Sequence, residues 1–302
     1  MTEKQMNILE EYERYLNLKG LRVIKRFILE VEEYFRYLLG FDIEYDRIAA
    51  FMGDDYRTYL VTEKNLSRGT VNNKLNRLNN FYRFLLKKNH IQRNPFYGTE
   101  RLKVTKSLPK KILSIDEMGK LLNNYSIRND YDVMTKSIVE LLYGSGLRIS
   151  EAVTLKLDDI DFENETIYIT ESKNNDLRRK CMTNRYSLNA VKEYIKYTRE
   201  KLVSKDEDYL YPIQPVGNYV CLLNSKLEKE CKRLNLPVIS THCFRHSVAT
   251  QLLRAGAGIR EVQAFLGHKS IKTTEIYTRV VKEDLKKVIE KYHPRENMEE
   301  NL

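Results

Sequence analysis

The amino-acid sequence predicts a mainly α-helical protein with a small β-sheet, divided into a helical N-terminal domain and a mixed α/β C-terminal domain. Apolar residues recur at helical spacing through most of the 302 residues. Residues 166–183 instead show the alternation and turn residues of a β-hairpin. A basic stretch without periodicity, residues 99–111, separates the two parts. We therefore expect domains at 1–98 and 112–302, joined by a basic linker.

Residues 6–98 predict four amphipathic helices, because apolar side chains return every three or four positions. Gly40 is expected to end the second helix and Ser67 to cap the fourth, while Asn94 and Pro95 oppose further helix. The expected core-facing residues of the four helices are Leu9, Tyr12 and Leu16; Ile24, Phe27, Ile28, Val31, Tyr34, Phe35 and Leu38; Ile48, Phe51, Met52, Tyr56, Tyr59 and Leu60; and Val71, Leu75, Leu78, Phe81, Tyr82, Leu85 and Leu86.

The formal net charge is +10, which favours a polyanionic partner such as nucleic acid. Basic residues lie on the outer faces of the fourth predicted helix and along the linker. A solvated helix face is the plain explanation, and a surface that contacts phosphates is the alternative. The candidates for DNA contact are Lys74, Arg77, Arg83, Lys103 and Lys106.

Cysteine usage and hydropathy bear on the compartment. The four cysteines form no Cys-x-x-Cys pair, so we expect reduced thiols and a cytoplasmic location. No apolar run approaches the roughly 20 residues that span a bilayer. The polar N-terminus lacks the pattern of a signal peptide, and we expect no membrane association.

The C-terminal domain is expected to combine helices with one hairpin. Ser114 is a predicted N-cap, and the helix that follows has inward residues beginning with Ile115. The next helix ends at Gly144–Ser145–Gly146, so that Arg148 directly follows a glycine turn. The hairpin strands are expected at 166–170 and 178–183. Further helices are expected at 186–202 and 222–234, with a loop at 205–217 between them.

Residues 241–277 predict three short helices that carry His242, Arg245, His268 and Tyr277. An arginine binds two phosphate oxygens at once, and a histidine donates hydrogen bonds or moves protons near neutral pH. A tyrosine hydroxyl becomes a nucleophile when cations stabilise its phenolate or a base removes its proton. The set therefore suits attack on a phosphodiester. For any one of these residues alone, an ordinary helix or turn position is the better explanation.

A metal site is a competing interpretation, because His242 and His246 are four residues apart. Cys243 follows the first histidine where a zinc protease has glutamate, so we expect no metal and no cofactor. His246 is instead expected to be buried and structural.

The sequence HCFRH followed by LGHKSIKTTEIYT resembles the signature of the tyrosine recombinase (phage integrase) family. That signature is His-x-x-Arg, then Leu-Gly-His, then a nucleophilic tyrosine nine residues after the histidine; His268 and Tyr277 have this spacing. GSGLRISEAVTL is similar to the first arginine motif of the family, which implies a catalytic role for Arg148 and an orienting role for Glu151.

The resemblance also implies a lysine on the hairpin, for which Lys173 is the first candidate. Here Ser172-Lys173-Asn174 replaces the usual Gly-Lys-Gly, and Lys180 is the alternative. In this family Tyr277 would form a 3′-phosphotyrosine, while Arg148, Arg245 and His268 would bind the phosphate. Lys173 would protonate the leaving 5′-oxygen, and His242 would help to move the proton of the tyrosine.

The N-terminal segment is similar to the helical core-binding (SAM-like) domain of Xer-type recombinases, and residues 280–292 resemble their C-terminal helix. This implies double-stranded DNA with paired recognition sites, a homotetramer or a heterotetramer with a related recombinase, and a DNA translocase as a further candidate partner. The implied role is the resolution of chromosome or plasmid dimers. The alternatives are a phage or mobile-element integrase or transposase, a type IB topoisomerase, and a DNA-binding protein without catalysis.

Overall fold

The computed structural model describes residues 1–21, 24–49, 51–104, 112–170, 178–203, 208–212, 216–268, 270–271, 273–275 and 277. The chain divides into two compact units, residues 1–105 and 106–302. The division falls within the stretch predicted as a basic linker. Among the described helices, none is long and apolar enough to cross a membrane.

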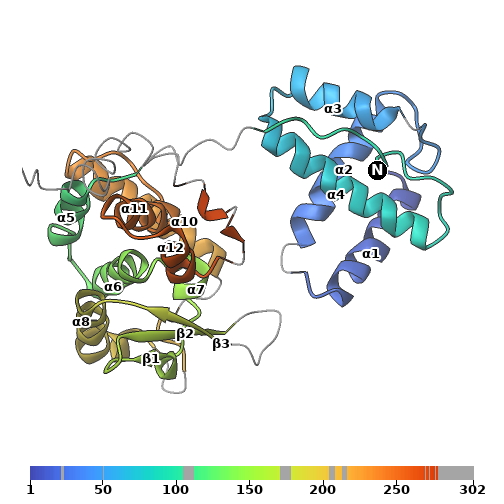
Figure 1. Ribbon diagram of the computed structural model, residues 1–302. Coiled ribbons are helices and arrows are strands. Elements are labelled where there is room, and N and C mark those ends of the chain that lie inside the picture. The colour runs from blue at the N-terminus through green and yellow to red at the C-terminus, as the bar shows by residue number, and fades with distance from the viewer. Residues whose placement is uncertain are drawn as a thin grey trace, which may run out of the picture. The chain divides into compact units, whose positions relative to one another are not determined.

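The first unit is helical, as predicted (Figure 1). Helix α2 packs against both α1 and α4, and α3 packs against α4. Ser67 caps α4 as expected, because its hydroxyl accepts a hydrogen bond from the backbone N–H of Thr70. The helices are α1 (Glu3–Leu18), α2 (Ile24–Leu39), α3 (Met52–Thr62) and α4 (Arg68–Lys87).

Aromatic side chains form much of the core of this unit. Tyr12 and Phe81 are fully buried, and their ring centroids are 5.0 Å apart in an edge-to-face arrangement. Two of the residues predicted to face the core are instead exposed, each near the end of a helix. Leu86 is 41% exposed, because α4 nears its end there, and Phe51 is 62% exposed, because α3 begins only at the next residue.

The second unit has helices around one small sheet, which confirms the predicted fold class. It also contains a 3-10 turn at Leu157–Asp159 and a π-helical segment at Ile195–Arg199. The helices are α5 (Ile115–Asn123), α6 (Asp130–Ser145), α7 (Ile149–Ala152), α8 (Arg185–Tyr194), α9 (Glu200–Leu202), α10 (Val216–Arg233), α11 (Thr241–Arg254) and α12 (Ile259–Leu266), and the strands are β1 (Ile160–Asp161), β2 (Thr166–Thr170) and β3 (Arg178–Met182).

The three strands are antiparallel in the order β1-β2-β3. The sequence predicted β2 and β3 but not the two-residue β1. In the β2–β3 register Ile167 pairs with Cys181, and Tyr168 pairs with Lys180. Since side chains alternate along a strand, Arg179 and Cys181 lie on one face of the sheet and Lys180 lies on the other.

Helix α6 is the central helix of this unit and packs against α8 and α11 (Figure 1). It ends at Gly146, whose φ of 61° is left-handed and therefore suits glycine. Two predicted boundaries differ. Helix α10 begins at Val216, earlier than expected, and the predicted helix 186–202 contains the π-helical segment. Ile115 is 68% exposed and not part of the core, because it lies in the first turn of α5.

Candidate active site

Arg148 is held by the end of α6 and by Glu151. It follows Gly146 and the buried Leu147, and it occupies the N-cap position of α7. Its guanidinium Nη1 donates to Glu151 Oε1 at 2.7 Å, and its backbone N–H donates to Glu151 Oε2 at 2.8 Å. One carboxylate thus fixes both the backbone and the side chain of Arg148. The arginine side chain is still 43% exposed, so it has room to accept a further anion.

Arg245 is buried on α11, at 5% exposure, and its guanidinium is bound by backbone oxygens. It donates to the carbonyl of Gly146 and, at 2.8 Å, to the carbonyl of Leu266. These carbonyls belong to the ends of α6 and α12, so Arg245 joins the two glycine turns. Burial lowers the pKa of Arg245 to about 10, and the positive charge of Arg148 adds to the effect.

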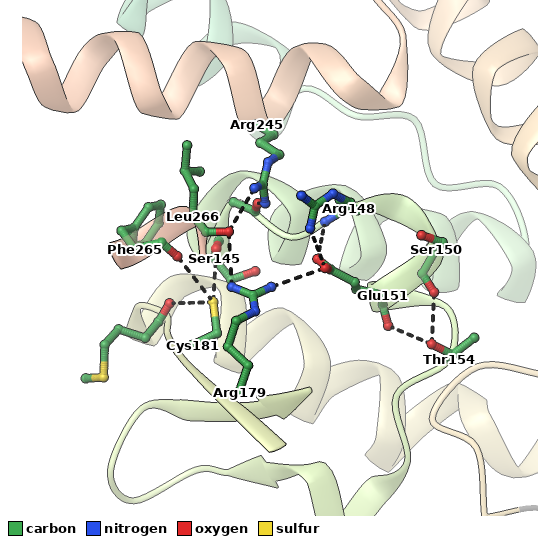
Figure 2. A network of polar contacts seen from close by, with 12 residues as sticks. Ser145, Arg148, Ser150, Glu151, Thr154, Arg179, Cys181, Arg245, Phe265 and Leu266 are labelled. Carbon is green, nitrogen blue, oxygen red and sulfur yellow. Dashed lines mark hydrogen bonds and ion pairs between the residues drawn. The ribbon is translucent and has the colours of Figure 1, made fainter. Parts of the chain in front are cut away.

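A third arginine, Arg179, completes the cluster from strand β3. Its Nη1 donates to the carbonyl of Leu266 at 3.1 Å, and its Nη2 lies 3.2 Å from Glu151 Oε1. Figure 2 shows its guanidinium between that carbonyl and Glu151. A Cβ at Gly267 would lie 2.1 Å from Arg179 Nη1, and the φ of Gly267 is +64°. The left-handed backbone therefore favours glycine at Gly267, and a Cβ there would also displace the Arg179 side chain from its present position.

Cys181 ties the same strand to the turn that precedes Arg148. It is buried, and its thiol donates to the carbonyl of Ser145 at 3.3 Å (Figure 2). Burial raises the pKa of Cys181 to about 11, so the group is a neutral thiol near pH 7. Strand β3 is thus bonded to both glycine turns, through Cys181 at the end of α6 and through Arg179 at the end of α12.

His268 follows Gly267 and is 8% exposed. Its Nδ1 lies 2.8 Å from the hydroxyl of Thr274. Burial and, to a smaller extent, the charges of Arg245 and Arg148 together lower the pKa of His268 to about 4. The ring is therefore neutral near pH 7. If Nδ1 accepts the hydrogen of the Thr274 hydroxyl, Nε2 carries the proton and is a hydrogen-bond donor.

Tyr277 lies in the same unit and is 1% exposed. Its hydroxyl is 2.7 Å from Nδ1 of His246 on α11, and the two ring centroids are 5.5 Å apart. Burial raises the pKa of Tyr277, whereas Arg245 and Arg148 act in the opposite direction. Tyr277 packs in a small apolar cluster with Ala249 of α11 and with Val262 and Leu266 of α12.

His242, the remaining predicted site residue on α11, is exposed in the first turn of that helix. The alternative lysine, Lys180, is exposed on the face of the sheet opposite to Arg179. Lys173 and residues 280–292 lie outside the described residues, as does Lys106. The structure therefore brings together Arg148, Arg245, His268 and Tyr277 but describes no position for the first lysine candidate.

The predicted DNA contacts of the first unit fall into two groups. Lys74 and Arg77 form ion pairs with Glu33 and Glu30 of α2, and their side chains are only 14% and 18% exposed. Arg83 on α4 and Lys103, which follows α4 in the sequence, are in contrast both exposed.

Sequence reasoning missed Arg179, Cys181 and the contact between His246 and Tyr277. The first two carried a usable signal, because strand alternation puts residues 179 and 181 on the face opposite to Lys180. His246 was expected to be buried and structural; it is half-buried, and its contact with the tyrosine was not predicted. No pattern in the sequence joins residues 246 and 277, because they meet only when α11 and the end of the chain pack together. Among the described residues, no three His, Cys, Asp or Glu side chains gather closely enough to hold a metal ion.

The family model described as "Phage integrase family" matches residues 111–284. Tyrosine recombinase XerC of Oceanobacillus iheyensis is 34% identical over 250 residues, which are 80% of this chain and 81% of that protein. Tyrosine recombinase XerC of Bacillus subtilis is 30% identical over 306 residues, and the match covers 97% of this chain and 98% of that protein.

Two solved structures have a similar fold. One is the XerH site-specific recombinase bound to a palindromic difH substrate in a post-cleavage complex, with a TM-score of 0.69 and 22% identity over 94% of this chain and 84% of that chain. The other is the Tn1549 transposon integrase in complex with transposon right end DNA, with a TM-score of 0.69 and 22% identity over 94% of this chain and 99% of that chain.

Proposed function

From the premise that this chain belongs to the phage integrase family and is a tyrosine recombinase that cleaves and rejoins DNA, we propose that Tyr277 is its nucleophile. The observation that supports this assignment most strongly is the position of the Tyr277 phenol, whose hydroxyl lies 2.7 Å from Nδ1 of His246, the neighbour of Arg245 on α11. Burial raises the pKa of this phenol, and the charges of Arg245 and Arg148 oppose that rise. Two cations beside a phenol favour its phenolate, and the same cations suit a phosphate that the phenolate attacks.

Arg148 and Arg245 bind the non-bridging oxygens of the scissile phosphate in this proposal. The two guanidiniums stabilise the charge of the five-coordinate transition state, and positioning with charge stabilisation is the main source of catalysis in phosphoryl transfer. His268 donates a hydrogen bond from Nε2 to the phosphate, since its Nδ1 faces Thr274. The family resemblance makes His242, in the exposed first turn of α11, a candidate for moving the proton of Tyr277.

The reaction conserves the energy of the broken phosphodiester in a 3′-phosphotyrosine, so rejoining to a new 5′-hydroxyl requires no ATP. The leaving 5′-oxygen must gain a proton, and Lys173 is our first candidate for that general acid. Lys180 is the second candidate, although its side chain lies on the face of the sheet opposite to the Arg179–Glu151 pair. The fixed cations at the phosphate are arginines, so we expect cleavage to proceed in EDTA.

Replacing Tyr277 with phenylalanine tests the assignment. The Tyr277→Phe protein should bind duplex sites about as well as the original chain, because one buried hydroxyl is removed and no cation changes. It should form no covalent complex on DNA nicked near the scissile phosphate, as measured on a denaturing gel. A persistent covalent band in Tyr277→Phe would move the nucleophile to another tyrosine, such as Tyr143 or Tyr168.

We further propose that the biological role is the resolution of chromosome or plasmid dimers, with double-stranded DNA carrying paired recognition sites as the partner. The similarity to XerC over nearly the whole chain supports this role, whereas the similarity in fold to a transposon integrase supports integration or transposition as the second candidate. Covalent complexes trapped in the genome distinguish the two: a single chromosomal or plasmid site supports dimer resolution, and sites at the ends of a mobile element contradict it.

Strand exchange between two duplexes needs four nucleophiles, so we propose a tetramer, formed by this chain alone or with a related recombinase. A DNA translocase is a candidate accessory partner. We propose that residues 280–292 dock on a neighbouring subunit of this tetramer. Deleting every residue after Arg279 should preserve binding to a single site and abolish cooperative assembly and recombination. Full recombination by the truncated chain would contradict docking between subunits.

A further inference from the structure

The Tyr277 hydroxyl is hydrogen-bonded to a histidine outside the predicted catalytic set. His246 Nδ1 lies 2.7 Å from the Tyr277 oxygen, which is the distance expected between a general base and the proton that it removes. His246 is the neighbour of Arg245 on α11, so the helix that supplies a phosphate-binding arginine also supplies this imidazole. His242, which the family resemblance assigns to proton movement, is exposed one turn earlier on the same helix.

We propose that His246, and not His242, is the general base that accepts the proton of Tyr277 during cleavage and returns it during rejoining. This inference rests on the proposed role of Tyr277 as nucleophile. As Tyr277 Oη attacks the phosphorus, its proton moves to His246 Nδ1, the phosphorus–O5′ bond breaks, and O5′ takes a proton from the separate general acid. In rejoining, the 5′-hydroxyl returns its proton to the deprotonated general acid and attacks the phosphotyrosine, the phosphorus–Oη bond breaks, and protonated His246 gives its proton back to the departing phenolate.

The charges around His246 favour the form that accepts a proton. Burial lowers the pKa of His246, and the neighbouring His242 and Arg245 of the same helix lower it further. His268 and Tyr277, from the chain after α12, also face this region. His246 is therefore neutral near pH 7, whereas burial keeps Tyr277 protonated because it raises the pKa of the phenol. A neutral imidazole beside a protonated phenol is the starting state that general base catalysis requires.

The hydrogen bond between His246 and Tyr277 has a second possible function, which is to hold the tyrosine in a resting position. Tyr277 is 1% exposed, so DNA binding must uncover its hydroxyl before attack. If the bond to His246 only held the tyrosine in a resting position, its loss would accelerate cleavage. If His246 is the base, its loss slows cleavage. The direction of the change therefore distinguishes the two functions.

The test compares His246→Gln with His242→Gln in the full chain, by single-turnover cleavage of nicked DNA across pH. Glutamine retains a hydrogen-bond acceptor for the Tyr277 hydroxyl but cannot take a proton near pH 7. For His246→Gln we expect a loss of roughly 100-fold or more at pH 7. Its rate should rise about tenfold for each pH unit, because the phenolate must form without a base.

The original chain and His242→Gln should both show rates that are level above the histidine pKa and that fall as pH decreases below it. This follows because the base must be unprotonated, and the lowered pKa of His246 places the fall below the ordinary value of about 6.5. The proposal is overturned if His246→Gln cleaves as fast as the original chain or faster, or if the acidic fall disappears in His242→Gln and persists in His246→Gln.

A substrate with sulfur in place of the bridging 5′-oxygen separates the base from the general acid. A thiolate leaves without protonation, since thiols have a pKa of about 8.5. This substrate should restore cleavage by a variant that lacks the general acid but not by His246→Gln; restoration of His246→Gln would assign His246 to the leaving group and overturn the proposal. Circular dichroism and a gel shift on the same DNA confirm folding and binding. Failure of the proposed function has a different result, a covalent complex that persists in Tyr277→Phe.

Discussion

The basic residues of α4 in the first unit and the arginine cluster of the second unit, Arg148, Arg179 and Arg245, differ in their partners. In the first unit, Lys74 of α4 pairs with Glu33 of α2, and Arg77 of α4 pairs with Glu30 of α2, which also lies 3.6 Å from Arg26. In the second unit, Arg148 and Arg179 share the single carboxylate of Glu151, and Arg245 donates only to the backbone carbonyls of Gly146 and Leu266.

We interpret this difference as one between cations that stabilise the fold and cations that, in the proposed mechanism, bind the phosphate of the DNA. A matched pair such as Lys74 and Glu33 is neutral as a unit, so it attracts a further anion less strongly than a cation without a carboxylate does. Three arginines with one carboxylate leave an excess of positive charge, and the burial that lowers the pKa of Arg245 to about 10 shows how poorly solvent compensates it. In the mechanism that we propose, a bound phosphodiester supplies the missing negative charge. The excess positive charge therefore lies in the same unit as Tyr277.

The strongest test of this contrast replaces one arginine in each unit by lysine. Arg245→Lys should lower single-turnover cleavage by roughly 100- to 1000-fold, because a point charge cannot bind the carbonyls and the phosphate with the geometry of a guanidinium. Arg77→Lys is the matched control, since a lysine can still pair with Glu30. Its cleavage rate should stay close to that of the original chain, and an equal loss in both variants would remove the distinction between the two units.

A second test concerns Arg179, which contacts Glu151 and the carbonyl of Leu266 but is not expected to contact the phosphate. We expect Arg179→Gln to slow cleavage by roughly 10- to 100-fold, because Arg148 and the turn before His268 lose a common support. Binding of nicked DNA should change little. Arg179→Lys should recover part of the rate, whereas an arginine that only adds charge would be replaced fully by lysine.

The sequence was sufficient for the fold class, for the hairpin, and for the positions of Arg148 and Arg245. Each of these depends on local chemistry: helical spacing, β-branched alternation, and a glycine at the end of α6 that must be left-handed. Not every partner of these arginines could be predicted. Glu151 lies three residues from Arg148 and was identified. Strand alternation indicated the face of β3 on which Arg179 lies, but not that Arg179 reaches the same carboxylate on α7. The contact of His246 with Tyr277 likewise spans 31 residues.

The same limit applies to the first unit. Periodicity placed Lys74, Arg77 and Arg83 together on the outer faces of one predicted helix, and all three became candidates for DNA contact. The packing of α2 against α4 then distinguishes them, because it brings Glu33 and Glu30 beside the first two and leaves Arg83 exposed. A periodic pattern identifies a face of a helix, but it does not identify the charges on the helix that covers it.

The third test measures the contribution of the Arg77–Glu30 pair to stability. Arg77→Ala leaves a carboxylate that is 8% exposed with only the more distant Arg26, 3.6 Å away, as a cation. The full chain should lose about 1–3 kcal/mol of unfolding free energy, measured by circular dichroism in urea. Adding Glu30→Gln to Arg77→Ala should recover part of the loss. If the double variant loses the sum of both single effects, the two side chains do not act as a pair.

The smallest expected effect would sharpen the contrast within α4 itself. Arg83 is exposed on this helix, so its charge is available to a DNA phosphate. Arg83→Ala should weaken duplex binding about equally for all DNA sequences and reduce the slope of log affinity against log salt by about one, because one fewer counterion is released.

Lys74→Met is the comparison: its cation already neutralises Glu33, so the salt slope should change less even if stability falls. Fluorescence anisotropy with a labelled duplex, repeated between about 50 and 200 mM salt, gives both slopes. A larger change for Lys74→Met than for Arg83→Ala would mean that the pairs with α2 open when DNA binds, and that matched cations in this unit also serve as phosphate contacts.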